Sequence, residues 1–133
     1  MKILLIDECA LGIKALEAAL VPLDVPTASA SSNDAALKSL IRGGVGLVVL
    51  AMGRPGADRL EVVRYMRRIG PMRCIPVITV SDRRYLPGFV VEAAQLEVAD
   101  VLTTPLDPQA LRFKARYLLT VHGRCATDHP SCP

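Results

Sequence analysis

The residues most able to do chemistry stand where apolar runs of this 133-residue chain end. Two adjacent carboxylates follow the run 2–6, one hydroxyl ends the run 75–81, and two hydroxyls follow the short run 101–102. Adjacent carboxylates suit Mg²⁺ or Ca²⁺, because hard cations prefer oxygen ligands. A cap on the following helix is the simpler interpretation of either carboxylate taken alone. The residues concerned are Asp7, Glu8, Ser81, Thr103 and Thr104.

The third apolar run, 46–52, ends differently. Its residues Leu47 to Leu50 are continuously apolar, and the next residue is Ala51, which carries only a methyl group. Alanine offers neither a nucleophile nor a metal ligand. The run therefore approaches the expected position of a site without supplying a reactive group.

Short apolar runs alternate with segments of helical period, which predicts an α/β fold with a parallel sheet. Right-handed crossovers make such a five-stranded sheet doubly wound, with helices on both faces. Ligands of these sheets gather at the carboxyl ends of the strands, so the polar residues should lie together. The predicted strands are 2–6, 23–30, 46–52, 75–81 and 101–102, and the last two predicted helices are 87–98 and 108–119.

Helical spacing predicts the buried faces of the second and third helices. Ser32 is expected to cap the second helix and Asp58 the third. The second should bury Ala36, Leu37, Leu40 and Ile41 before Gly43 ends it. The third should bury Leu60, Val63 and Met66, with Arg59, Arg64, Arg67 and Arg68 largely facing solvent.

Composition limits the class of protein. The chain is 51% hydrophobic with only five aromatic residues, which suits an aliphatic core rather than a platform for stacking bases. A net charge of +3 is too mild to indicate nucleic acid directly. No apolar run approaches the length of a membrane span, and the N-terminus does not resemble a signal peptide. We therefore expect a cytoplasmic protein with reduced cysteines.

The chain divides most simply into one domain, 1–121, and a tail, 122–133, that is disordered or begins a linker. The tail contains the pattern HxxCxxxHxxC, formed by His122, Cys125, His129 and Cys132. These are zinc-competent ligands, but nothing between them would shape a site. We therefore favour the disordered or linker interpretation of the tail.

Four segments, in order, resemble a response-regulator receiver domain of the CheY-like type: ILLIDE, LVVLAxxxPGxDxLEVVR, IPVIxxS and ADxLxxPL. The resemblance extends over residues 2–119 and implies the flavodoxin-like receiver fold. It also implies that Asp7 and Glu8 match the family's Mg²⁺ carboxylates, and that Ser81 matches the hydroxyl that contacts the phosphoryl group. Pro105 matches the proline that follows the fifth-strand site.

The chain departs from the family at five positions. The phosphoryl-accepting Asp falls on Ala51, and the phosphate-binding Lys before the proline falls on Thr104. The aromatic switch residue falls on Val101. In the loop after the third strand, Arg54 stands for a Met, and Arg59 stands for the Gly that follows the capping Asp.

These departures indicate a degenerate pseudo-receiver that is not an enzyme. An acyl phosphate needs a carboxylate nucleophile, and loss of the Lys removes a cation that would stabilise phosphoryl oxygens. Asp7 and Glu8 alone should bind Mg²⁺ weakly or not at all, and no other cofactor is expected. Alternatives remain open: an acceptor relocated to Asp58 or Asp82, pairing of the acids with Arg54 or Arg83, or another ligand. That ligand would occupy a vestigial pocket of Asp7, Glu8, Ala51, Ser81, Thr103 and Thr104.

Without chemistry, function would pass to surfaces. The resemblance implies a dimer or output face on the fourth helix, fifth strand and last helix, here drawing on Phe89, Ala93, Leu96, Leu102, Arg112 and Arg116. The leading hypothesis is a phosphorylation-independent, two-component-type module that contacts a partner protein or an attached output domain, and it includes a possible homodimer. The alternative is a small-ligand or metal sensor using the vestigial acidic pocket.

Overall fold

The computed structural model describes residues 1–54, 56 and 58–128, with side chains described as far as residue 121. Five parallel strands form one sheet in the order β2-β1-β3-β4-β5. They are β1 (Lys2–Ile6), β2 (Thr27–Ala30), β3 (Val45–Ala51), β4 (Val77–Asp82) and β5 (Asp100–Thr104). The predicted doubly wound α/β fold is confirmed. The order changes direction between β1 and β3, which is the type of position where such sheets bind ligands.

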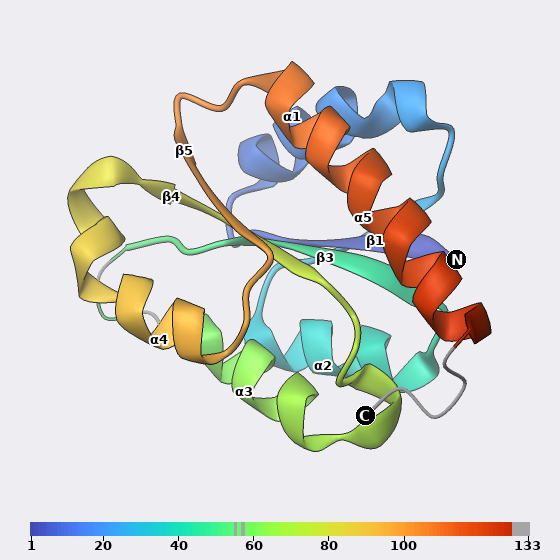
Figure 1. The fold of residues 1–133 in the computed structure, drawn as a ribbon. Helices are drawn as coiled ribbons and strands as arrows, with labels where there is room; N and C mark the ends of the chain where they lie inside the picture. The colour runs from blue at the N-terminus through green and yellow to red at the C-terminus, as the bar shows by residue number, and fades with distance from the viewer. Residues whose placement is uncertain (55, 57, 129–133) are drawn as a thin grey trace.

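Helices cover both faces of the sheet (Figure 1). α1 (Ala10–Leu20) and α5 (Pro108–Asp128) lie on one face, and α2 (Asn33–Arg42), α3 (Leu60–Arg68) and α4 (Val90–Gln95) lie on the other. Three short 3₁₀ helices complete the chain: η1 (Val21–Leu23), η2 (Gly70–Met72) and η3 (Arg83–Gly88).

The strands bury side chains on both faces because each face is covered. On β1, Ile3 and Leu5 pack with α1 and α5, while Leu4 and Ile6 pack with α2 and α3. This alternation follows from the two-residue period of a strand. It explains why the first and third strands are continuous apolar runs in the sequence.

α2 confirms most of its predicted features. The Ser32 hydroxyl accepts a hydrogen bond from the Ala35 amide at 3.1 Å, and Gly43 ends the helix with a φ of 86°. Ile41 is the exception, since 64% of it is exposed. At 3.6 residues per turn, Ile41 lies roughly 140° around the helix from Ala36, on the flank of the buried stripe.

α3 differs from prediction at its start. Arg59 occupies the N-cap position in helical conformation, and no side chain caps the helix there. The Asp58 carboxylate, predicted to be the cap, instead pairs with Arg64. Leu60, Val63 and Met66 are buried as predicted. The prediction that these arginines largely face solvent is wrong for Arg59, which is buried, and holds only in part for Arg64 and Arg67, which are half-buried.

Element lengths also differ from prediction. The segment predicted as one helix over 87–98 is η3 followed by the short α4, because Phe89 leaves helical conformation between them with a φ of −135°. The α4 segment ends before Glu97, which has a φ of 57°. α5 continues past Leu119, and past the predicted domain boundary at 121, to Asp128.

Other expectations meet the structure only in part. No helix within the described residues combines the length and apolarity needed to cross a membrane. Cys9 is an exposed free thiol, whereas Cys74 is disulfide-bonded, so the expectation of reduced cysteines is not met at Cys74. The four zinc-competent residues of the tail, His122, Cys125, His129 and Cys132, are not among those whose side chains the structure describes.

Candidate functional site

The parallel register brings the predicted site residues to one edge of the sheet. Ala51 of β3 pairs with Val80 of β4, and Ser81 pairs with Thr103 of β5. β1 joins the same edge because Ile6, which precedes Asp7, pairs with Leu50. The predicted vestigial pocket residues Asp7, Glu8, Ala51, Ser81, Thr103 and Thr104 therefore follow or end four adjacent strands.

Asp7 turns back onto the start of α1. Its Oδ1 accepts a hydrogen bond from the Cys9 amide at 2.9 Å, as in an Asx turn. The carboxylate also lies so close to Gly12 that a Cβ at that position would overlap it. Asp7 is therefore not the cap that the simpler interpretation expected, since Cys9 is the N-cap of α1 and no side chain caps the helix, but it organises the turn that leads into the helix.

Glu8 is held by an arginine. Oε2 of Glu8 lies 3.2 Å from an Nη of Arg59, whose other Nη donates to Oδ1 of Asn33 at 2.9 Å. Asn33 in turn donates to the Asp58 carbonyl at 2.9 Å. The Arg59 side chain is 9% exposed, whereas that of Glu8 is 50% exposed. The buried guanidinium thus links the loop after β1, the start of α2 and the loop after β3.

The sequence left open whether Asp7 and Glu8 pair with Arg54 or Arg83. In the structure Glu8 pairs instead with Arg59. Arg54 and Arg83 are both exposed. A signal for Arg59 was present, since it stands where the resemblance expects a glycine. Its helical position argued against burial, and its partner Glu8 lies 51 residues away in the chain.

The residues at this edge do not fit the divalent cation that the resemblance implies. Glu8 is paired with a cation already, Asp7 accepts a backbone hydrogen bond, and Ala51 has no oxygen to offer. Among the described side chains, no three His, Cys, Asp or Glu residues gather in a way that could hold a metal ion. The carboxylate of Glu8 at this edge therefore forms an ion pair within the protein and does not serve as a metal ligand.

The hydroxyl residues of β4 and β5 differ in how far they are buried. Ser81 is 3% exposed and Thr79 is fully buried, and neither hydroxyl has a hydrogen-bond partner among the described residues. Thr103 is half-buried, and Thr104 is exposed where the resemblance expects the lysine. Thr104 supplies no charge to this edge.

Asp82, directly after Ser81, is engaged by its neighbour. Its Oδ2 lies 2.8 Å from an Nη of Arg84, and its Oδ1 accepts from the Arg84 amide at 2.8 Å. The side-chain and backbone hydrogen bonds from Arg84 lower the pKa of Asp82 to about 2. An Asp held in this way is a poor candidate for a relocated acceptor.

This contact predicts a specific pH dependence. The folded-state pKa of Asp82 is depressed, so its contribution to stability is present above the ordinary pKa of 3.8 and is lost as the pH falls towards about 2. An Arg84→Gln variant should raise the pKa of Asp82 towards its ordinary value. Carboxyl ¹³C chemical shifts followed by NMR between pH 5 and pH 1 measure it. An unchanged midpoint in the variant would contradict the assigned cause.

Most of the predicted interface residues are half-buried. Ala93 is 1% exposed, and Phe89, Leu96 and Leu102 pack against the two core clusters. Nε of Arg112 donates to the Ala19 carbonyl at 3.0 Å, so this residue faces α1. Arg116 is exposed. The large apolar side chains that α4 and α5 expose are instead Val90, Val91, Phe113 and Tyr117.

No protein-family model and no curated protein matches the chain. Among solved structures, it is similar to a CheY-like response regulator receiver domain protein from Methanospirillum hungatei. The TM-score is 0.80 at 15% identity, over 92% of this chain and 96% of that one. The chain has the receiver-domain fold.

Two further structures share this receiver fold. The receiver domain of a signal transduction histidine kinase from Syntrophus aciditrophicus gives a TM-score of 0.76 at 22% identity, over 90% of each chain. NtrX from Brucella abortus gives 0.79 at 20% identity, over 92% of this chain but 27% of that longer chain. The matched fold thus spans most of two of these solved chains and about a quarter of the third.

Proposed function

We propose that this protein is a receiver-like signalling module that works without phosphorylation, through contacts with other proteins. The carrying observation is Ala51, which ends β3 at the edge where the receiver fold places its phosphoryl acceptor. Alanine cannot form an acyl phosphate, because that intermediate requires a carboxylate nucleophile.

The neighbouring groups support this proposal. The cation at the edge is the guanidinium of Arg59, which is committed to Glu8 and Asn33. The alternative acceptors are also engaged, since Asp58 pairs with Arg64 and Asp82 with Arg84. The same pairing of Glu8 leaves the metal-sensing alternative without a specific observation in its favour.

Surface chemistry supports a protein partner or an attached output domain. Phe113 and Tyr117 are 72% and 54% exposed and lie one turn apart on α5. Lys114 lies over the Tyr117 ring at 5.8 Å. Apolar side chains with a cationic neighbour resemble the mixed composition of reversible protein interfaces. Such a face could equally serve a second copy of this chain.

Acetyl phosphate tests the central part of the proposal. The protein is incubated with acetyl phosphate and MgCl₂ and weighed intact by mass spectrometry, beside a receiver domain that has the acceptor Asp. We expect no phosphoryl gain in this protein, because residue 51 has no carboxylate. We also expect no shift of its melting temperature with MgCl₂. A hydroxylamine-sensitive gain of one phosphoryl group would refute the proposal.

A further inference from the structure

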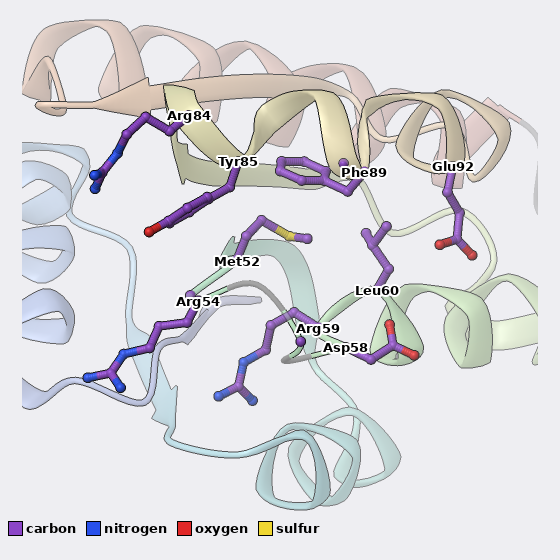
Figure 2. Close-up of a pocket in the computed structure, with 12 residues that line it drawn as sticks. Met52, Arg54, Asp58, Arg59, Leu60, Arg84, Tyr85, Phe89 and Glu92 are labelled. Carbon is purple, nitrogen blue, oxygen red and sulfur yellow. The ribbon is translucent and has the colours of Figure 1, made fainter.

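A cavity lies between residues 52–54, 56 and 58–60, which follow β3, and the segment of η3 and α4 (Figure 2). Its volume is about 490 Å³. Pockets that bind small organic molecules have volumes of roughly 300–1,000 Å³. The cavity is therefore large enough for such a ligand.

The interior of the cavity is apolar and aromatic. Met52 and Leu60 are 7% and 2% exposed, and Phe89 packs against the same core cluster. The ring of Tyr85 extends over the cavity from η3, next to Phe89 (Figure 2). A hydrophobic or aromatic group is the ligand chemistry that these side chains favour.

The two ends of the cavity differ in charge. Asp58 and Glu92 lie at one end, and the single guanidinium of Arg64 pairs with both, so it offsets only one of their two charges. Arg54 lies at the other end, on the same side as the Tyr85 hydroxyl. None of the described carboxylates forms an ion pair with Arg54. Charge is therefore separated along the cavity, and the end at Arg54 is the positive one.

A second observation indicates that the ligand carries a hydrogen-bond acceptor. Arg59 lines the cavity and is 8% exposed, and its Nε is buried with no hydrogen-bond partner among the described residues. An unpartnered buried donor is costly. A ligand oxygen that accepts a hydrogen bond from this Nε would remove that cost.

We propose that this cavity binds a small amphipathic carboxylate, with its apolar group against Met52, Leu60 and Phe89 and its carboxylate towards Arg54. The site is separate from the vestigial acidic pocket, and Arg59 forms the wall between them. Binding would therefore place the ligand against the residue that holds Glu8 and Asn33.

The test uses two probes with the same ring and opposite charge, 1-naphthoate and 1-naphthylmethylammonium. ¹H–¹⁵N NMR titrations of the full chain follow the amides of the cavity lining, such as Gly53, Gly88 and Phe89. We expect naphthoate to shift these amides in a saturable way and to bind more tightly than the ammonium probe. Arg54→Gln should weaken naphthoate binding about tenfold, as for loss of one charge-assisted contact. Arg68→Gln changes an exposed arginine that ends α3 and does not line the cavity, so it should leave binding unchanged.

A cavity-filling pair gives an independent check. A Cβ built on Gly88, which lines the cavity, meets nothing within 4 Å, and the same holds for Gly70, which lies outside it. Gly88→Leu should abolish naphthoate binding, whereas Gly70→Leu should retain it. Equal binding of both probes, no saturable shift at the lining amides, or unchanged binding in Arg54→Gln and Gly88→Leu would overturn the proposal.

Discussion

Replacing Arg67 by Met is expected to destabilise the protein by about 3 kcal/mol. The guanidinium of Arg67 donates to four carbonyls, those of Leu96 at 2.8 Å, Ile75 at 2.9 Å, Arg73 at 3.0 Å and Glu97 at 3.4 Å. These carbonyls end α4 and the segment that leads into β4. Methionine keeps most of the side-chain volume and removes every donor, so the carbonyls lose their partner together.

Urea unfolding measures this loss as a change in the free energy of unfolding. Arg67→Lys should recover part of the loss, because an ammonium has three donors but lacks the planar fork. Arg68→Met, at the adjacent exposed position, should change stability by less than about 0.5 kcal/mol. A loss in Arg67→Met no larger than in Arg68→Met would show that these hydrogen bonds contribute nothing net.

The second large effect is expected at Arg59. Arg59→Met should cost about 2 kcal/mol, because it retains the buried stem but removes the hydrogen bonds to Asn33 and Glu8. The pair with Glu8 supplies only a small part of that loss, since the Glu8 side chain is half exposed and solvent screens it.

Glu8→Gln separates the two contributions. This variant removes the ion pair but keeps the contact of Arg59 with Asn33, so we expect a loss of about 0.5 kcal/mol or less. Thermal and urea unfolding of both variants provide the measurement. If Glu8→Gln cost as much as Arg59→Met, the ion pair rather than the buried hydrogen bond would be the main contribution of Arg59.

The sequence contained enough information for the sheet and for the edge at which its polar residues meet. Continuous apolar runs such as Leu47 to Leu50 identify strands buried on both faces, and parallel order then aligns their ends. Ser32 and Gly43 mark the limits of α2 through local backbone chemistry. These features depend on neighbours in the chain, so they can be predicted from the chain.

The arginines could not be placed in this way. Helical periodicity assigned Arg59 and Arg67 to solvent, but their partners are Glu8, Asn33 and the carbonyls around Leu96, which the fold brings from elsewhere in the chain. Asp58 has the residue type of a cap, yet the contact with Arg64 takes its carboxylate. The cavity could not be predicted for the same reason. The two segments that line it, one before β4 and one after it in the chain, meet only in the folded protein.

The contact network of Arg59 limits which substitutions could give this protein a phosphoryl acceptor. Introducing a carboxylate at Ala51 alone would not create a phosphorylatable site, since Glu8 remains bound to Arg59 and Thr104 brings no charge. Removing Arg59 first would lower stability before any activity could be selected. A phosphorylatable site would thus require several substitutions that are each unfavourable or neutral alone. Such epistasis makes that chemistry hard to acquire one substitution at a time.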